Sequence, residues 1–382
     1  MALRDILVRG FSRKVSPFRP GHRVELLIDG GPFFDRFVEA IEAAQSYVFI
    51  ESYIVAADKT GWRVANALAE RARAGVEVAM MYDGFGSIDL DEDLVQFLDA
   101  AGVKTHAFRP LSLSKRVWPW SQRNHRKILV VDGQVGVVGG MNIASEYDAV
   151  ERGGEGWRDT AVCVQGPAVG DLEQLFRQLW RREKAERLTS SPLRPPEFPD
   201  GDEVRFLGNF ARRDRAFIRR AYLLAITSAK TSIRIMNAYF IPDRVIRTAL
   251  VRAANRGVLV EIVVGGSTDV KAALYATRAL YSRFLKNGVR IYEWREKVLH
   301  AKTAVIDGEW STVGSSNLDY LSSFRNLEVN AGIAGQRVGT IMEQQFEADR
   351  NRSQRIDLQL WRARPVSWRF FEWFFRVVAR TY

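Results

Sequence analysis

Residues 125–142 read HRKILVVDGQVGVVGGMN, and residues 300–317 repeat the pattern as HAKTAVIDGEWSTVGSSN. Both copies have the form H-x-K-x(4)-D, and six further residues separate the Asp from a Gly-led turn that ends in Asn. His, Lys, Asp, Gly and Asn each recur 175 positions later, so the spacing is the same for all the matched residues. The chain contains only four histidines, and two of them occupy this frame. Such a doubled pattern indicates an internal duplication that carries the functional residues.

The duplication extends over most of the chain. Residues 46–53 (SYVFIESY) resemble residues 232–239 (SIRIMNAY), and residues 73–78 resemble residues 255–260. Each copy is predicted to run strand, helix, strand, helix and then two short strands around an Asp-Gly turn. In the first copy the expected strands are 48–53, 76–82 and the pair within 128–138, and the expected helices are 61–74 and 94–101. Apolar strands alternating with amphipathic helices predict an α/β fold with helices on the faces of a sheet.

The segment between the copies is rich in proline. Residues 189–202 contain four prolines, which predicts an exposed linker. We expect an N-terminal α/β domain at 1–190, a linker at 191–202, a C-terminal α/β domain at 203–349 and a basic, aromatic segment at 350–382.

Composition indicates a soluble globular chain with affinity for polyanions. Hydrophobic residues make up 47% and charged residues 26%, as in ordinary globular proteins. The net charge of +11 predicts attraction to nucleic acid or to an anionic membrane surface. Cys163 is the single cysteine, so neither an intramolecular disulfide nor a thiolate metal cluster is expected. The sequence contains neither an 18-residue apolar stretch nor a signal-peptide core, which predicts a cytoplasmic protein.

The residue types in the repeated frame suit attack on a phosphodiester. On a strand, a His and a Lys two positions apart point to the same side. One neutral imidazole can attack phosphorus, and a second, protonated imidazole can donate a proton to the leaving alkoxide from the other side. Lys127 and Lys302 would neutralise the non-bridging oxygens, and Asn142 and Asn317 would donate hydrogen bonds to them. This chemistry needs no metal or other cofactor, and the sequence contains no usual His/Cys metal-ligand spacing.

Four acidic residues accompany this set. Asp132 and Asp307 are counted with the catalytic histidines, His125 and His300, although each precedes a Gly in a hairpin turn and a structural role is at least as well supported. Two further acids are candidates to hydrogen-bond the imidazoles of their own or the opposite half: Asp159 and Glu328. The alternative for Asp159 is a surface ion pair with its neighbour Arg158.

These residues resemble the phospholipase D superfamily, whose mark is two copies of H-x-K-x(4)-D, each followed by a Gly-led turn. Within it the chain is most similar to bacterial cardiolipin synthases of the short type without N-terminal transmembrane helices. The matching strings are residues 27–30 (LIDG), 50–54 (IESYI), 83–87 (DGFGS), 124–127 (NHRK), 139–142 (GGMN), 157–159 (WRD), 300–302 (HAK), 314–319 (GSSNLD) and 326–328 (NLE).

The resemblance implies two pseudo-symmetric phospholipase D-like α/β sandwich domains that form one shared active site. It implies transfer of a phosphatidyl group between phospholipids, through a phosphohistidine, to give cardiolipin. By the same resemblance His125 is the nucleophile and His300 the acid and later the base. Ser315 can offer a hydroxyl in the second turn where the first turn has Gly140, which predicts chemically unequal halves.

Two segments suggest contact with a membrane. Residues 109–127 are basic and aromatic and include Trp118 and Trp120, which suit the headgroup region or packing on the domain. Near the C-terminus four aromatic side chains are the expected contacts: Trp368, Phe370, Trp373 and Phe374. Residues 366–380 have the pattern of an amphipathic helix in the plane of an anionic surface, and the alternative is a helix docked on the core. The expected partners are phospholipids and the cytoplasmic side of the cell membrane.

Three other functions are compatible with parts of the pattern. A hydrolytic phospholipase D would use water as acceptor, and the choice depends on how dry the pocket is. A nuclease of the same superfamily would share the site chemistry, but the Trp/Phe-rich C-terminus argues against nucleic acid as the partner. A non-catalytic scaffold would be expected to have lost one motif, whereas both are intact.

Overall fold

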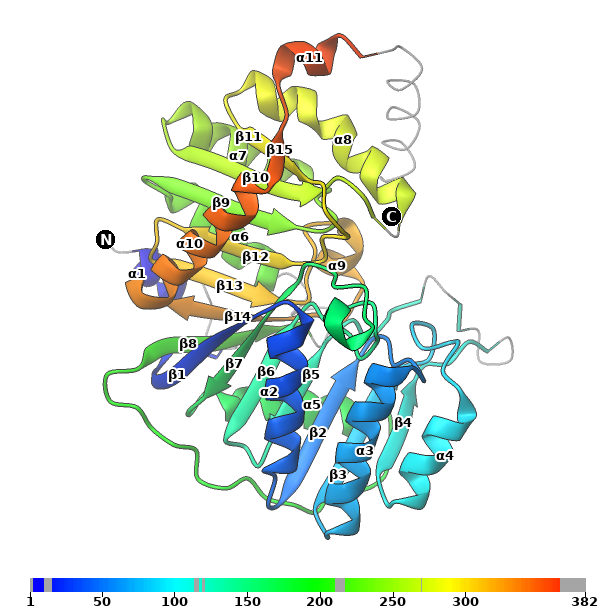
Figure 1. The fold of residues 1–382 in the computed structure, drawn as a ribbon. Coiled ribbons are helices and arrows are strands. Elements are labelled where there is room, and N and C mark those ends of the chain that lie inside the picture. The colour runs from blue at the N-terminus through cyan, green and yellow to red at the C-terminus, as the bar shows by residue number, and fades with distance from the viewer. Residues whose placement is uncertain are drawn as a thin grey trace.

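One continuous mixed sheet organises the protein. The computed structural model describes residues 3–9, 16–112, 117–118, 121–209, 217–268 and 270–364. In these ranges fifteen strands form the sheet in the order β15-β11-β10-β9-β12-β13-β14-β8-β1-β7-β6-β5-β2-β3-β4. The two halves of the sheet meet where β1 (Arg19–Ile28) pairs antiparallel with β8 (Asp202–Gly208), between the lower and upper parts of Figure 1.

The two halves repeat the same elements. The other N-terminal elements are α1 (Leu3–Arg9), α2 (Gly30–Glu42), β2 (Tyr47–Ser52), α3 (Lys59–Arg73), β3 (Glu77–Asp83), α4 (Glu92–Ala100), β4 (Lys104–Phe108), β5 (Ile128–Val131), β6 (Val135–Gly139), η1 (Val150–Arg152), β7 (Thr160–Gln165) and α5 (Val169–Arg182). The C-terminal elements are α6 (Phe217–Ser228), β9 (Ser232–Asn237), α7 (Arg244–Asn255), β10 (Leu259–Gly265), α8 (Lys271–Lys286), β11 (Arg290–Trp294), β12 (Lys302–Ile306), β13 (Trp310–Gly314), α9 (Tyr320–Phe324), β14 (Val329–Ala334), α10 (Gln336–Asn351), β15 (Ser353–Arg355) and α11 (Leu358–Arg362). Outward from the junction both halves have one strand order, β1-β7-β6-β5-β2-β3-β4 and β8-β14-β13-β12-β9-β10-β11. The α/β class with two repeated segments is therefore confirmed.

Strand β2 shows why helices cover both faces of the sheet. All six of its residues are buried. Val48 and Ile50 pack with apolar residues of α2 and α3, whereas Tyr47 and Phe49 pack with those of α5. Successive side chains of a strand point to opposite faces, so both faces of this strand need cover. Each large apolar side chain that is fully buried contributes about 1.5–3 kcal/mol relative to an exposed one.

A shared apolar cluster joins the two halves. Val138 and Val162 from the first half belong to the same cluster as Val313 and Val329 from the second half. All four side chains are at most 1% exposed. Because the cluster is continuous, the motif-bearing hairpins β5–β6 and β12–β13 are held in a fixed relation to each other.

The segment between α5 and β8 contains neither helix nor strand and none of its residues from 183 to 201 is buried. It crosses the N-terminal half, where the amide of Leu193 donates to the carbonyl of Asp132 at 2.9 Å.

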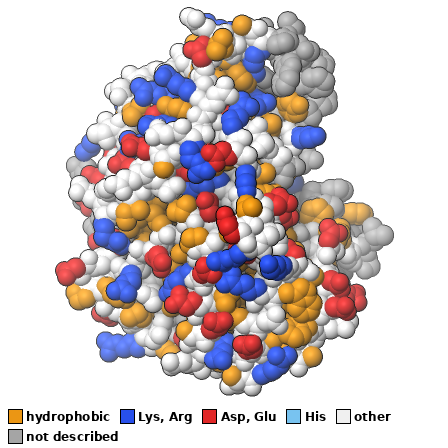
Figure 2. All heavy atoms as spheres, in the orientation of Figure 1, with side chains coloured by type: hydrophobic (Ala, Val, Ile, Leu, Met, Phe, Trp, Pro, Cys, Tyr) orange, Lys and Arg blue, Asp and Glu red, His pale blue; other side chains and the backbone are white. Residues whose placement is uncertain are grey.

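Acidic and basic side chains are interspersed on the face that Figure 2 shows. Within the described ranges, none of the helices combines the length and the apolar composition that crossing a bilayer requires.

Candidate active site

The two motifs have the same local geometry. His125 and Lys127 directly precede the buried strand β5, and Lys302 opens β12 two residues after His300. Lys127 is 5% exposed and Lys302 is fully buried, so their ammonium groups lie inside the protein. Each Nζ donates to the carbonyl oxygen of the histidine two residues earlier. The His-x-Lys spacing thus ties each ammonium to its own histidine.

Backbone hydrogen bonds join each histidine to the opposite half. The amide of His125 donates to the carbonyl of Leu327 at 3.0 Å, and the amide of His300 donates to the carbonyl of Arg158 at 2.8 Å. Leu327 and Arg158 each directly precede an acidic residue, so both histidines are placed beside a carboxylate from the other half. The two backbone hydrogen bonds between the halves are related by the same pseudo-symmetry as the two halves of the sheet.

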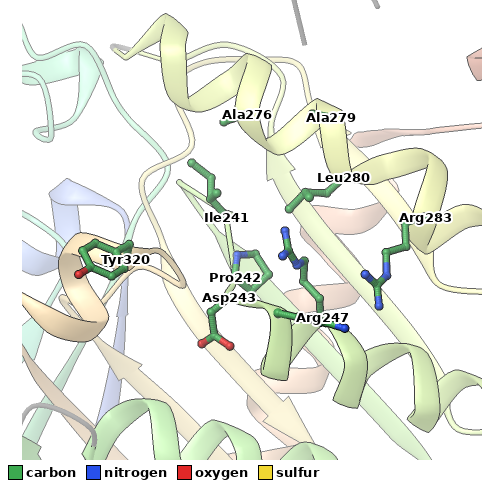
Figure 3. A pocket seen from close by; sticks show the side chains of 10 residues that line it. Ile241, Pro242, Asp243, Arg247, Ala276, Ala279, Leu280, Arg283 and Tyr320 are labelled. Carbon is green, nitrogen blue, oxygen red and sulfur yellow. The ribbon is translucent and has the colours of Figure 1, made fainter. Parts of the chain in front are cut away.

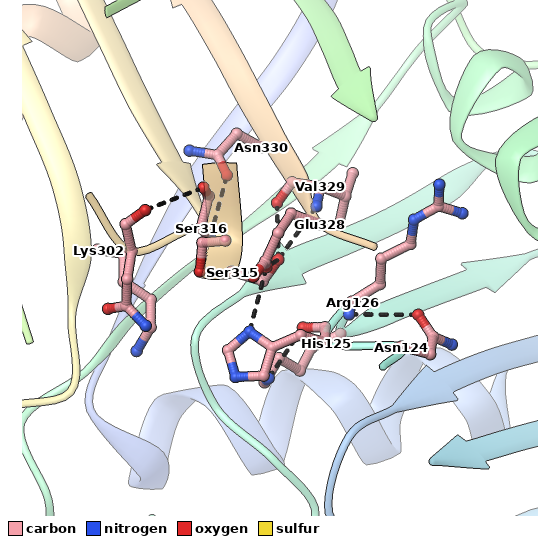
Figure 4. Close-up of polar contacts among 12 residues, drawn as sticks. Asn124, His125, Arg126, Lys302, Ser315, Ser316, Glu328, Val329 and Asn330 are labelled. Carbon is pink, nitrogen blue, oxygen red and sulfur yellow. Dashed lines mark hydrogen bonds and ion pairs between the residues drawn. The ribbon is translucent and has the colours of Figure 1, made fainter. Parts of the chain in front are cut away.

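The first of these pairs is His125 with Glu328. The imidazole Nδ1 lies 3.1 Å from a carboxylate oxygen of Glu328, which is itself fully buried. The Ser315 hydroxyl donates to the same oxygen and accepts from the Val329 amide at 3.0 Å. Figure 4 shows the imidazole directed at Glu328 with Ser315 beside it. The side chain of His125 remains 14% exposed, so solvent or a ligand can reach its ring.

The second pair is His300 with Asp159. The imidazole Nδ1 lies 2.7 Å from Asp159 Oδ2, and the Lys302 ammonium lies 3.0 Å from the same nitrogen. Gly140 occupies the position that Ser315 has in the other half, and a Cβ there would come within 2.5 Å of both Asp159 oxygens. Position 140 therefore cannot supply a hydroxyl to this pair, so the two carboxylates have different hydrogen-bond partners.

Buried charges set the protonation of the site. Burial lowers the pKa of His125, and the negative charge of Glu328 partly offsets this shift. Burial and the positive charge of Lys302 lower the pKa of His300, and Asp159 partly offsets that shift. Burial also lowers the pKa of Lys127 to about 7. Both imidazoles are therefore neutral at neutral pH, and a neutral imidazole can act as a nucleophile.

Aromatic rings surround the imidazoles, and they were missed in the sequence as members of the site. The Tyr53 ring lies 4.9 Å from that of His125 between centroids, and the Lys127 ammonium lies 5.3 Å from the Tyr53 centroid. The ring of His300 lies 5.1 Å from Tyr147 and 6.0 Å from Trp157. The sequence contained a signal for Tyr53. It is the last residue of the repeated stretch 46–53 and directly follows the buried strand β2.

The side chains of the two turn asparagines make hydrogen bonds to other groups of the protein. Asn142 accepts from the amide of Ile54 at 3.1 Å and donates to the Tyr147 hydroxyl at 2.7 Å, and Asn317 accepts from the amide of Tyr239 at 3.4 Å. Both residues are at most 3% exposed. These side chains hold the neighbouring loops, and contact with a phosphate oxygen stays a prediction.

Asp132 and Asp307 lie at the far ends of β5 and β12 from the histidines. Asp132 accepts from the backbone amides of Gln45, Ser46 and Tyr47, each at 2.8 Å. Asp307 accepts in the same way from the three amides of residues 230–232 at 2.8–2.9 Å. Both aspartates have positive φ, 53° and 55°, a left-handed conformation that Asp tolerates better than most residues. This geometry gives no support to their place among the catalytic residues, because the carboxylates are occupied at the opposite ends of their strands.

Arg158 is buried rather than at the surface, so the alternative for Asp159, a surface ion pair with this arginine, does not hold. Its guanidinium makes two hydrogen bonds with Asp349, at 2.9 and 2.6 Å, and one with Asp29 at 3.3 Å. It also donates to the backbone carbonyl of Asp159. The Asp159 carboxylate is left to His300 and the Thr160 amide, and the buried arginine fixes the loop that presents it.

The basic, aromatic segment before the first motif is only partly a free surface. Trp118 is 38% exposed. Arg123 is buried and donates to the carbonyls of Arg109 and Trp118 at 2.8 and 2.6 Å, so it shapes the loop. Several predicted membrane contacts lie outside the described residues: Trp120, Trp368, Phe370, Trp373 and Phe374. Across the described part of the chain, no group of three or more His, Cys, Asp or Glu side chains is placed to hold a metal ion.

Comparison with known proteins gives the family. The family described as "Cardiolipin synthase, PLD-like domain" matches residues 37–180 and 222–350. Cardiolipin synthase from Geobacillus kaustophilus is 35% identical over 359 residues, which cover 93% of this chain and 72% of that protein. Cardiolipin synthase B from Salmonella typhimurium is 35% identical over 328 residues, which cover 82% and 76%. The fold is similar to that of phosphatidylserine synthase from Haemophilus influenzae, with a TM-score of 0.71, 13% identity and 90% of both chains covered. With both motifs intact and the match extending over both halves, the chain belongs to the cardiolipin synthase family of phospholipase D-like proteins.

Proposed function

We propose that this chain is a cardiolipin synthase that transfers a phosphatidyl group between two phospholipids, two phosphatidylglycerols giving cardiolipin and glycerol. The observation that carries the proposal is the crossed pairing of His125 with Glu328 and His300 with Asp159. Each pairing occupies Nδ1 and leaves Nε2 for chemistry. Because each imidazole is held by the opposite half, both rings lie at the boundary between halves, where they can act on one phosphorus atom.

In the first step, Nε2 of His125 attacks the phosphorus of the donor phospholipid. A nitrogen–phosphorus bond forms, the bond from phosphorus to the headgroup oxygen breaks, and His300 supplies the proton that the leaving glycerol takes. The ammonium groups of Lys127 and Lys302 face the charge that develops on the non-bridging oxygens. Glu328 stabilises the imidazole ring of His125 as it becomes positively charged.

In the second step, a hydroxyl of the acceptor phospholipid attacks the phosphohistidine. His300, now neutral, takes the hydroxyl proton while the new phosphorus–oxygen bond forms and the bond to His125 breaks. Water in place of the acceptor would give phosphatidic acid. The rings of Tyr147 and Trp157 against His300 reduce the room for water near the base, which favours the lipid hydroxyl.

The acid in the first step must gain its proton when substrate binds. The positive charge of Lys302 contributes to the lowered pKa of His300 in the unliganded chain. A bound phosphodiester is an anion that offsets the lysine charges, so it favours the protonated forms of His300 and Lys127. Binding of phosphatidylglycerol should therefore take up a proton, which a pH indicator in weakly buffered solution can measure.

The substrates place the protein at a membrane surface. We propose a peripheral position on the cytoplasmic side of the cell membrane, in contact with anionic phospholipids. The exposed ring of Trp118 and the net charge of +11 support this position. Residues 365–382, with their arginines and aromatic side chains, would add an interfacial anchor.

Trapping the covalent intermediate tests the assignment of the two histidines. A p-nitrophenyl ester of phosphatidic acid has a leaving group that needs no proton, so His300→Ala should release one equivalent of nitrophenolate and retain lipid on His125. His125→Ala should release none and retain none. Retention of lipid by His125→Ala but not by His300→Ala would reverse the roles. Retention by neither variant, with full transfer activity in both, would end the phosphohistidine proposal.

A further inference from the structure

A groove in the C-terminal half lies outside the paired histidines. It has a volume of about 460 Å³ and lies between α7, α8 and the loop that follows β9 (Figure 3). Ile241, Ala276 and Leu280 supply apolar lining. A groove of this volume, with these three residues as its apolar floor, suits part of an acyl chain better than a small polar solute.

Three arginines give the groove a positive charge. Arg244, Arg247 and Arg283 line it together with a single acidic residue, Asp243. Asp243 is already engaged by Arg219, which lies outside the lining and donates two hydrogen bonds at 2.5 and 3.1 Å. The lining therefore has two more positive than negative charges, next to an apolar floor. Guanidinium groups suit phosphate oxygens because their donors match the oxygen geometry.

The groove is connected to the second motif. The amide of Ile241 donates to the carbonyl of Leu318 at 2.9 Å, and Leu318 directly follows the motif residue Asn317. Tyr320, on the other wall, is 44% exposed and follows in the same segment. Asp319, between Leu318 and Tyr320 in the sequence, lies close enough to Lys302 and Glu328 for their charges to influence its pKa. One short segment thus forms a wall of the groove and part of the histidine site.

We propose that this groove binds a second anionic phospholipid, with its phosphate among the three arginines and one acyl chain along the apolar floor. The inference rests on the proposed function, since transfer between lipids needs two phospholipid molecules near the motifs. The other occupant to consider is the protein's own segment 365–382. That segment contains three arginines and one glutamate, so it is positively charged like the groove and the two repel each other. Charge complementarity therefore favours the lipid.

Photolabelling of the full chain tests the proposal. The probe is a short-chain phosphatidylglycerol with a diazirine on one acyl chain, and labelled peptides are identified by mass spectrometry. Labelling of peptides from α7 and α8 should fall about tenfold, equivalent to ~1.4 kcal/mol of binding free energy, in the double variant Arg247→Gln/Arg283→Gln. Ala279→Trp, which fills the groove without changing charge, should reduce labelling as much.

A matched control removes the same charge elsewhere. Arg187→Gln/Arg194→Gln changes two exposed arginines of the segment between the halves and should label like the unchanged chain. Unlabelled dihexanoyl phosphatidylglycerol should compete, whereas inorganic phosphate at the same concentration should not. Equal competition by phosphate would mean a simple anion site and would overturn the proposal.

Two further outcomes separate this inference from the proposed function. Normal glycerol release with no labelling of α7 and α8 in the unchanged chain would end the inference and leave the proposed function standing. Labelling without any lipid turnover would leave the groove as a lipid site and end the proposed function. Increased labelling after removal of residues 365–382 would identify that segment as the occupant and overturn the inference.

Discussion

Replacing Asp132 should destabilise the fold and leave the chemistry intact. The Asp132→Ala variant loses three hydrogen bonds from the amides of residues 45–47. Tyr47 is fully buried, so its amide would lose its partner without access to water, at about 1–3 kcal/mol. The amides of Gln45 and Ser46 are nearer the surface and can rehydrate, which costs about 0.5–1.5 kcal/mol each. The expected loss in free energy of unfolding is therefore about 2–6 kcal/mol, a large fraction of the stability of most proteins.

Asp307 offers a matched comparison in the other half. Its partners are the amides of Lys230, Thr231 and Ser232, of which the first two are exposed. Water can reach the first two amides freely and the partly buried Ser232 amide in part, so each lost bond should cost about 0.5–1.5 kcal/mol and Asp307→Ala about 1.5–4.5 kcal/mol, less than Asp132→Ala. Asp132→Asn retains one acceptor oxygen and the tolerance for a left-handed backbone, and should lie between the unchanged chain and Asp132→Ala.

Urea unfolding followed by tryptophan fluorescence measures the stability of these variants. Glycerol release from short-chain phosphatidylglycerol, normalised to the folded fraction, measures their turnover. We expect Asp132→Ala to unfold at lower urea and to keep its kcat while folded. An unfolding midpoint equal to that of the unchanged chain, with kcat reduced about 100-fold as for loss of an acid or base, would refute the anchoring role.

Four other predictions concern the site and the membrane. Glu328→Gln and Asp159→Asn each weaken a charge-assisted contact with a histidine, so kcat/KM for transfer should fall about 10–100-fold; an unchanged kcat/KM would exclude the orienting role. The pKa of Lys127 is lowered to about 7, so its ammonium is lost as pH rises through that value. Inhibition by tungstate, an oxyanion that resembles phosphate, should weaken over this range, and Lys127→Gln should remove the pH dependence. Removal of residues from Pro365 onward should lower sedimentation with anionic vesicles while the circular dichroism spectrum stays unchanged; equal sedimentation would contradict an interfacial anchor. Incubation with EDTA should leave the transfer rate unchanged, and recovery by an added divalent cation after a loss would show a metal requirement.

The two halves share a plan but differ chemically. Ser315 donates to Glu328, whereas Gly140 leaves no hydroxyl beside Asp159. Glu328 therefore has an additional donor that stabilises its negative charge. The carboxylate beside His300 has instead the backbone amide of Thr160 as a second donor. This difference gives a structural basis for unequal histidine roles.

Local patterns in the sequence predicted much of the architecture. The strand and helix ranges of the first copy agree with β2, α3, β3, α4 and the β5–β6 pair, because apolar periodicity and Gly-containing turns specify such elements locally. The order β1-β7-β6-β5-β2-β3-β4 and the β1–β8 junction could not be predicted from these local patterns. Strand order depends on pairing between distant segments, which a single strand's pattern does not encode.

The sequence by itself determined the duplication, the α/β class and the placement of each lysine with its histidine, because these depend on local spacing and on a repeat that can be read along the chain. Only the tertiary structure decided which carboxylate meets which imidazole. Asp159 lies 141 positions from His300, and Glu328 lies 203 positions from His125. Contacts at such separations exist because two separately patterned halves pack through one apolar cluster. The geometry of that packing, rather than any local motif, brings each acid across the boundary.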